Sequence, residues 1–200
     1  MSVAEIIAVG TPGLLETVIA ALEAGNLVIL PTETVYGIAA RADFPLATKR
    51  LANCKRRPEQ NDFAHLISGL DDIRKFIPDP PPRAMIIARR FFPGPLTLVI
   101  EHDGRTMGFR CPAHPFPLLV ARNARFPIVL TSANLSGHPP ARDIGEVDAS
   151  GLLVAPAVMV DGGRSRYGLS STVVSVRGDI VRVVREGALP STRIPFLTNE

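Results

Sequence analysis

Two runs of alternating polar and apolar residues near the C-terminus constrain the fold most. The runs STVVSV at 171–176 and IVRVV at 180–184 flank Gly178-Asp179. A glycine-containing two-residue turn between alternating runs is typical of a β-hairpin. A hairpin is antiparallel by construction, so the sheet that contains it cannot be purely parallel.

Helical and extended patterns alternate irregularly along the rest of the chain. Leu14, Val18 and Leu22 share one helical face, and we expect that helix to open at Thr11-Pro12 and close at Gly25. The other predicted helices are 45–54, 71–77, 82–92 and 115–123, and the other predicted strands are 27–31, 96–100, 105–110, 127–131 and 158–160. With the hairpin, this order predicts one α/β domain over residues 1–200 with a mixed sheet.

Composition excludes several classes of protein. Of the 200 residues, 46% are hydrophobic and 20% charged, which is typical of a globular chain. A net charge of +3 suits an anionic ligand such as a nucleotide or RNA without identifying one. There is no signal-peptide pattern and no apolar run near the roughly 18 residues of a membrane span. Cys54 and Cys111 are far apart, so we expect a cytoplasmic protein without disulfides.

The stretch PTETVYG at 31–37 directly follows a predicted buried strand. It places three hydroxyls (Thr32, Thr34 and Tyr36) and the Glu33 carboxylate within five residues. A turn that only closes its own backbone needs one or two polar side chains. This excess of polar groups marks a candidate ligand site.

The stretch KRRP at 55–58 follows the predicted helix 45–54. A lysine at 55 and an arginine at 57 can hold a polyphosphate through a point charge and a planar fork. The alternative is a solvated basic helix end, stabilised by the helix dipole.

TSANLSG at 131–137 follows the predicted strand PIVL. Ser132 and Asn134 lie on one side of an extended chain, so a hydroxyl and an amide can meet one ligand. The alternative is a turn in which these side chains bond their own backbone.

Arg110 lies in an otherwise apolar predicted strand that ends in CPAHP. A buried arginine needs an anion or carbonyl partner, either a ligand or a structural salt bridge. We interpret His114 in the same stretch as conformational rather than catalytic. Ser170, Ser171 and Thr172, and Arg185 at the far end of the hairpin, suit either turn or ligand roles.

The residues suggest no covalent catalysis. There is no Ser-His-Asp or Cys-His pattern, no GxxxxGK[ST] loop and no paired histidine spacing for a metal. If the protein is an enzyme, we expect it to act by positioning and charge.

The order of the motifs is more specific than any one of them. PTETVYG, KxRP, PGPLTLV, RxPAHP, SANLSG, DGG, STVV and RxG follow one another over about residues 12–187. This series resembles the YrdC-like family of threonylcarbamoyl-AMP synthases. The resemblance implies an open, twisted α/β sheet that encloses a deep, positively lined cavity.

The resemblance also implies a reaction. L-threonine, bicarbonate and ATP would give threonylcarbamoyl-adenylate and pyrophosphate, with Mg²⁺ carried by ATP. The product would pass to a separate tRNA threonylcarbamoyl transferase for modification of tRNA. The chain would be the minimal form of the family, and weak tRNA binding would be compatible with its charge.

Matching positions imply site residues. The resemblance assigns ATP contacts to seven residues: Lys55, Arg57, Asn61, Thr106, Ser132, Asn134 and Arg185. It treats Lys55, Arg57, Ser132 and Asn134 as catalytic. It assigns L-threonine contacts to Thr34, Arg110 and Ser171.

Some positions depart from the family pattern. After KxRP the family often has NPL and then a histidine. NDFAHLI at 61–67 lacks that proline, and His65 is one position away from the usual histidine, so we do not assign His65 to threonine. Ser170 stands where the family usually has glutamate. One alternative is therefore a non-catalytic YrdC-like paralogue that binds RNA or nucleotide. Another is a carbamoyl-handling domain from a larger maturation factor.

Overall fold

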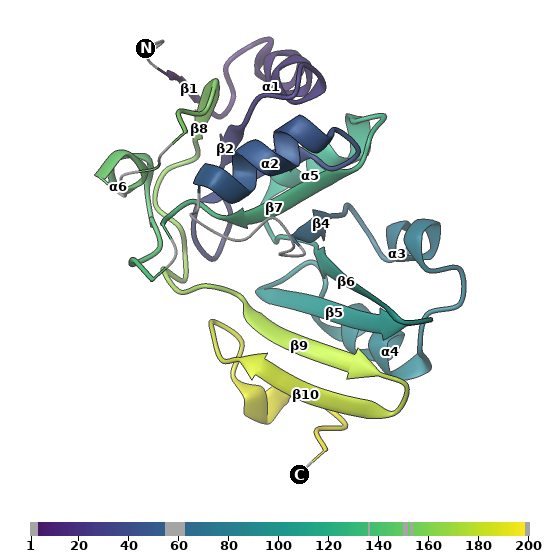
Figure 1. The fold of residues 1–200 in the computed structure, drawn as a ribbon. Helices are drawn as coiled ribbons and strands as arrows, with labels where there is room; N and C mark the ends of the chain where they lie inside the picture. The colour runs from purple at the N-terminus through teal and green to yellow at the C-terminus, as the bar shows by residue number, and fades with distance from the viewer. Residues whose placement is uncertain (1–3, 55–62, 136, 150–151, 153, 199–200) are drawn as a thin grey trace.

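The computed structural model describes residues 4–54, 63–135, 137–149, 152 and 154–198. Within them ten strands form one sheet in the order β1-β8-β2-β3-β7-β4-β6-β5-β9-β10 (Figure 1). The strands are β1 Glu5–Ala8, β2 Val28–Leu30, β3 Gly37–Arg41, β4 Ala64–Leu66, β5 Leu96–His102, β6 Arg105–Arg110, β7 Ile128–Ser132, β8 Val158–Asp161, β9 Thr172–Arg177 and β10 Ile180–Arg185. The helices are α1 Leu14–Glu23, α2 Pro45–Cys54, α3 Asp71–Phe76, α4 Pro82–Phe91, α5 Pro115–Asn123 and α6 Ile144–Ala149, with a 3-10 turn at Ser191–Arg193.

The sheet has two halves with separate cores. Strands β1, β8, β2, β3 and β7 lie between two apolar clusters. In one cluster α1 and α5 contribute Val18 and Val120, and in the other α2 and α6 contribute Leu51 and Val147. This half therefore has three layers.

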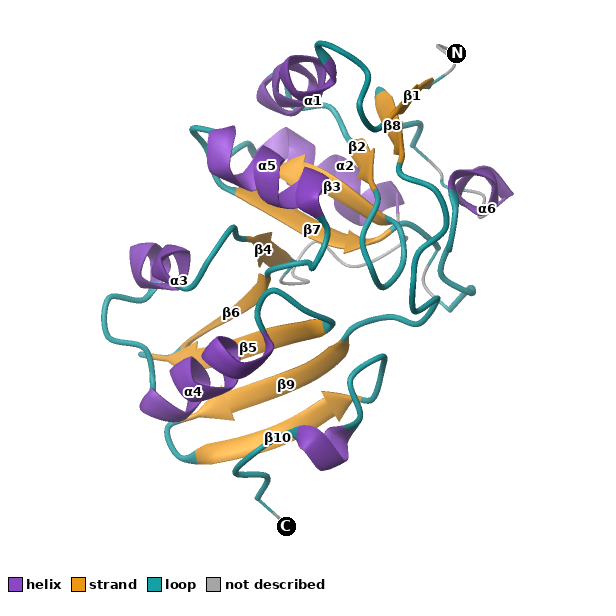
Figure 2. Ribbon diagram, turned by 180° about the vertical axis from the view of Figure 1, so that it is seen from behind, coloured by secondary structure: helices purple, strands orange, loops and turns teal. Residues whose placement is uncertain are grey.

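The second half of the sheet consists of β4, β6, β5, β9 and β10, and helices α3 and α4 lie on one of its faces (Figure 2). Ile73 of α3 and Ile87 of α4 pack there with Phe109 and Val174 of the strands. The pleat sends alternate side chains of these strands to the opposite face. That face is the one available to a ligand.

The predicted hairpin is confirmed as β9 and β10. The register pairs Arg177 with Ile180, and Gly178 in the turn has φ +54°. Strand β9 is also parallel to β5, while β5 and β6 are antiparallel. The sheet is thus mixed, and the predicted α/β class is confirmed.

The predicted start of the first helix is wrong. Thr11 provides no cap; the residue before the helix is Gly13, with φ +79°, and the Thr17 hydroxyl donates back to its carbonyl at 2.9 Å. The predicted end is right, because Gly25 has φ +77° and its N–H reaches the Leu22 carbonyl. No helix in the described ranges is long and apolar enough to cross a membrane.

Candidate functional site

One cavity of about 340 Å³ lies on the face of the second half that carries no helix. Strands β3 to β7, β9 and β10 and the loop before β3 contribute its walls. Its polar lining includes Thr32, Thr34, Tyr36, Thr97, Thr106, Arg110, Thr131, Ser132, Ser170, Ser171 and Arg185. Most of these groups are hydroxyls, and the only charged lining groups among the described residues are two arginines.

The pleat of β6 explains why its polar residues reach the cavity. Thr106, Gly108 and Arg110 line it, whereas the intervening Met107 and Phe109 pack in the core under α3 and α4. A side chain at 108 would lie 3.2 Å from the Cα of Ala64 on β4. The centre of the cavity floor therefore has no large side chain, and the polar groups of β6 stand at its ends.

The hydroxyls of the loop 31–36 form a directed chain. The Thr32 hydroxyl donates to the Val35 carbonyl at 2.6 Å, so its single proton is used. The 2.8 Å contact between the Thr32 and Thr34 hydroxyls must then be donated by Thr34. Thr34 also accepts a bond from Arg110 Nη2 at 3.2 Å. Its hydroxyl is left with a lone pair, and no proton, for a ligand.

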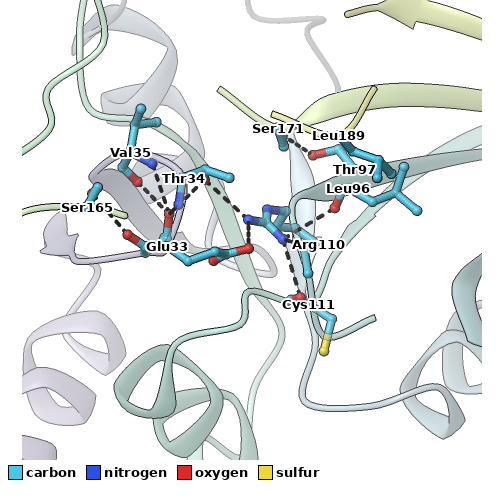
Figure 3. Close-up of polar contacts among 12 residues, drawn as sticks. Glu33, Thr34, Val35, Leu96, Thr97, Arg110, Cys111, Ser165, Ser171 and Leu189 are labelled. Atoms are coloured by element: carbon cyan, nitrogen blue, oxygen red, sulfur yellow. Dashed lines mark hydrogen bonds and ion pairs between the residues drawn. The ribbon is translucent and has the colours of Figure 1, made fainter. Parts of the chain in front are cut away.

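Arg110 is buried at 4% exposure and joins this loop to β6 (Figure 3). Its Nη2 donates to Glu33 Oε1 at 2.8 Å, and Nη1 donates to the carbonyls of Gly94, Leu96 and Cys111. The structural salt bridge considered from the sequence is therefore present. Among the described residues only Nε of this guanidinium has no acceptor within hydrogen-bond distance.

Two hydroxyls from neighbouring strands meet beside Arg110. Thr97 of β5 and Ser171, which precedes β9, are 2.7 Å apart through their hydroxyl oxygens. Arg185 of β10 donates to the Ser171 carbonyl at 2.8 Å and so holds the strand start in place. Sequence reasoning missed Thr97, because it read LTLVI as a core strand. Its signal was the single polar residue in that apolar run.

Tyr36 fixes the loop Asp161-Gly162-Gly163 to the cavity wall. Its hydroxyl donates to the Gly163 carbonyl at 2.7 Å and accepts from the Gly162 N–H at 3.0 Å. Burial raises the pKa of Tyr36 to about 12, with the nearby Asp161 carboxylate adding to that effect. The phenol is thus a neutral structural group at neutral pH.

The structure brings six of the ten predicted site residues to this cavity, and they are Thr34, Thr106, Arg110, Ser132, Ser171 and Arg185. Asn134 is buried but does not line it. Its amide nitrogen donates to the carbonyls of Leu135 and His138, as in the turn alternative considered above. Lys55, Arg57 and Asn61 lie outside the described residues.

Two histidines of the motifs do not face the cavity. His65 stacks on Phe76 with ring centroids 4.3 Å apart, on the side of β4 opposite Ala64, which lines the cavity. His114 is the cap of α5, where its Nδ1 accepts the Phe116 N–H at 3.3 Å. Burial lowers the pKa of His114, which favours the neutral ring that a capping acceptor requires.

The described residues contain no group of three or more His, Cys, Asp or Glu side chains that could hold a metal ion. Cys111 lies behind the cavity wall, and burial raises the pKa of its thiol to about 11, so it is not a nucleophile at neutral pH. The site therefore offers hydroxyls, backbone groups and guanidinium N–H donors. This set suits a small polar ligand held by hydrogen bonds.

The comparisons place the chain in a family. The Sua5/YciO/YrdC family model, described as "Telomere recombination", matches residues 20–187. The chain belongs to this family, and the resemblance drawn from its motifs is confirmed.

Several curated relatives carry the same functional name. Threonylcarbamoyl-AMP synthases of Pyrococcus abyssi and Bacillus subtilis are 33% and 34% identical over 88% of this chain. The chain spans about half the length of these two relatives, 54% in each case. A threonylcarbamoyl-AMP synthase of Xanthomonas euvesicatoria is 32% identical over 74% of this chain and 85% of its own.

Solved structures share the fold. P. abyssi Sua5 complexed with L-threonine has a TM-score of 0.86 and 30% identity, covering 96% of this chain and 60% of its own. E. coli YciO has a TM-score of 0.78 at 20% identity, covering 94% of this chain and 96% of its own, and supports the fold alone.

Proposed function

We propose that this chain makes threonylcarbamoyl-adenylate from L-threonine, bicarbonate and ATP, with release of pyrophosphate. The product would serve the threonylcarbamoyl modification of tRNA through a separate transferase. The proposal includes a cytoplasmic location.

One observation carries the proposal. A relative that superposes on 96% of this chain is described with L-threonine bound, and the cavity here gathers Thr34, Arg110 and Ser171 at one end. These are the three positions that the resemblance assigns to the amino acid. Thr106 and Ser132, assigned to ATP, line the same cavity.

The chemistry requires two steps and no protein nucleophile. The threonine nitrogen bonds to the carbon of carbon dioxide or bicarbonate. With carbon dioxide the nitrogen releases a proton, and with bicarbonate that proton and the departing hydroxide leave together as water. A carbamate oxygen then attacks the α-phosphorus of ATP. The new P–O bond forms as the bond to the pyrophosphate oxygen breaks, and pyrophosphate leaves. Such a displacement needs alignment, positive charge and exclusion of water.

The residues of this chain would divide that work between the two ends of the cavity. Thr34 presents a lone pair, which suits an amine N–H of the amino acid. Arg110 would reach the carboxylate through Nε, or through Nη2 if the Glu33 pair opens. Lys55 and Arg57, which the resemblance assigns to ATP, would neutralise the phosphates. Mg²⁺ would arrive with ATP, held by phosphate oxygens and water.

The rival function is that of a non-catalytic paralogue that binds nucleotide or RNA. The amide of Asn134 favours it slightly, because that group already bonds two carbonyls of its own turn. The hydroxyl-rich end built around Arg110 favours the synthase, since a nucleotide binder has no need of an amino-acid subsite.

Pyrophosphate release from ATP by the purified chain distinguishes the synthase from the non-catalytic paralogue. L-threonine and bicarbonate are omitted in turn, with Mg²⁺ present throughout. Release that requires both supports the synthase. Nucleotide binding without release under any condition would overturn it and favour the paralogue, for which binding of unmodified tRNA is the next measurement.

A further inference from the structure

Two residues of the cavity lining, Ser170 and Arg185, each have a large and exposed apolar neighbour in the sequence. Leu169 is 59% exposed and Val184 is 64% exposed. Among the large apolar side chains that the structure describes, only Leu46 on α2 is comparably exposed, at 60%. A single exposed apolar side chain is ordinary, but two that adjoin the lining of one cavity mark its mouth as a contact surface.

The backbone on both sides of Leu169 is held in place. The Tyr167 N–H donates to the Glu33 carbonyl at 2.9 Å, and the Ser170 carbonyl accepts the Ala188 N–H at 2.8 Å. Leu169 therefore lies between two anchored residues and is presented to solvent by a fixed loop.

Val184 is presented by a bulge in β10. The register shifts between Val183 and Arg185, and Val184 is the residue left without a partner across the ladder. Arg185 donates to the Ser171 carbonyl at 2.8 Å, so this end of β10 is joined to the start of β9 (Figure 1). A partner would meet ordered side chains on both segments, which lowers the entropy cost of binding.

Tyr167 and three exposed arginines lie beside the two apolar residues. Tyr167 is 41% exposed, and the Arg166 guanidinium lies 5.4 Å from the centre of its ring. Arg142 lies against Gly168, where an added Cβ would be 3.2 Å from Arg142 Cδ. Arg182 is exposed on β10, just before the bulge. In the described part of the chain no carboxylate pairs with any of these three arginines.

The carboxylates of the same segments are already bonded. Asp143 and Glu146 pair with Arg164 at 2.9 and 3.8 Å, and Glu186 accepts the Ser191 N–H at 2.7 Å. The mouth therefore combines exposed apolar side chains with positive charge that the described residues do not neutralise.

This combination favours a protein partner over a nucleic acid. Phosphates are bound by cations and bases by flat faces, and Leu169 and Val184 supply neither. Protein interfaces combine an apolar centre with tyrosine and arginine, and they are poor in lysine. The complementary surface is an apolar patch framed by carboxylates.

The place of this surface at the cavity mouth indicates which protein would use it. Under the proposed function the product is a mixed anhydride of a carbamic and a phosphoric acid, which water hydrolyses. The enzyme that consumes it joins an amine nitrogen of tRNA to the carbamoyl carbon. The bond from that carbon to the AMP oxygen breaks, and the nitrogen loses a proton. A protein docked over the mouth would receive the product before it reaches bulk water.

We propose that Leu169, Val184 and the arginines beside them form a docking surface for the enzyme that accepts the adenylate. This rests on the proposed function and deepens it, because it assigns the surface across which the product leaves.

The test uses this chain and the purified tRNA threonylcarbamoyl transferase of the same organism. Calorimetric titration measures binding, and a coupled assay compares pyrophosphate released with threonylcarbamoyl groups gained by tRNA. The double variant Leu169→Asn plus Val184→Thr keeps side-chain size and should weaken binding by about tenfold or more. Its pyrophosphate release without the transferase should be unchanged, while the tRNA modified per pyrophosphate released should fall. Arg166→Glu should also weaken binding, and more so at low salt than at high salt.

Leu46→Asn is the matched control, because Leu46 is equally exposed but lies on α2, and it should bind as the parent does. A parent chain that releases pyrophosphate but does not bind the transferase would overturn the proposal, as would parent-like binding by the double variant. Binding of tRNA alone, or self-association in sedimentation, that the double variant abolishes would assign the surface to RNA or to a second copy and overturn it too. Failure of the parent to release pyrophosphate would instead reject the proposed function, on which the proposal rests.

Discussion

Arg110 and Glu33 form an ion pair across 77 residues of sequence, with Nη2 2.8 Å from Oε1. Both side chains are more than nine-tenths buried, at 5% and 6% exposure. The pair connects the hydroxyl loop before β3 to the end of β6. The position of Thr34 at the cavity therefore depends on a charge contributed by a distant strand.

Removing one partner of this ion pair should lower the free energy of unfolding of the protein. Arg110→Met leaves the Glu33 carboxylate buried without its cation, which typically costs about 3–5 kcal/mol. Urea unfolding of Arg110→Met, Glu33→Gln and the double variant measures the effect. The double variant should recover part of the loss. A single variant as stable as the parent would show that the pair contributes nothing.

The acceptor role of Thr34 predicts a selective kinetic effect. Thr34→Val removes the lone pair offered to the amino acid while keeping the shape of the side chain. We expect the KM for L-threonine to rise about five- to tenfold, the size of one net hydrogen bond, with the KM for ATP unchanged. Thr48→Val on α2, remote from the cavity lining, is the control. Equal changes in both KM values would contradict the assignment.

The phosphate role of Lys55 and Arg57 is testable although both lie outside the described residues. Lys55→Ala and Arg57→Ala should each lose a charge-assisted contact of about 1.5–3 kcal/mol. The loss should appear in the dependence of pyrophosphate release on ATP, with the thermal unfolding midpoint unchanged. Full activity in either variant would remove that residue from the site.

The lowered pKa of His114 should make the stability of the fold depend on pH. Burial lowers its pKa in the folded chain, opposed by the Glu33 charge, so the unfolded chain binds the proton first as pH falls. Its contribution to stability is present above the unfolded pKa of about 6.5 and declines below it, through the folded pKa. His114→Asn keeps a capping acceptor and should show a smaller slope of unfolding free energy between about pH 7 and pH 5. An unchanged slope would assign the effect to other groups.

The close packing of Gly187 should couple the hairpin to the end of the cavity that carries Ser171. A side chain there would overlap the backbone of Ser170 and Ser171, with the Ser171 carbonyl oxygen 2.7 Å away. Gly187→Ala should therefore lower the unfolding midpoint by several degrees and raise the KM for L-threonine. Gly69→Ala, where nothing lies within 4 Å, is the control. A Gly187→Ala variant with parent-like KM and stability would show that the strand start can shift freely.

The sequence predicts the elements whose polarity alternates, whose helical face is clear or whose apolar run has sharp ends. The hairpin, strands β5, β6 and β7 and helix α1 are of these kinds. Strand β3 was missed because four of its five residues are buried, so that no alternation marks it. Strand β4 has only three residues, too few for a period to appear. The cap of α1 was misplaced because a left-handed glycine replaced the expected hydroxyl.

The site was predictable mainly through the order of its motifs. No local pattern connects Thr34 with Arg110 or Ser171, because each lies on a different segment. The partner of Arg110 was not predicted, since Glu33 is adjacent to it only in the fold. Thr97 was missed because a threonine inside an apolar strand is normal for β-structure. Its position in the cavity lining and its contact with Ser171 exist only in the fold.

The two cores of the sheet have a consequence for the path of the chain. Residues up to Cys54 and those from Pro115 to Asp161 build mainly the first half, and the remainder builds mainly the second. The chain thus passes between the halves three times, after Cys54, after Arg110 and after Asp161. The passages after Arg110 and after Asp161 adjoin the predicted site residues Arg110 and Ser171. A ligand in the cavity contacts both halves, so its binding should make them unfold as one cooperative unit.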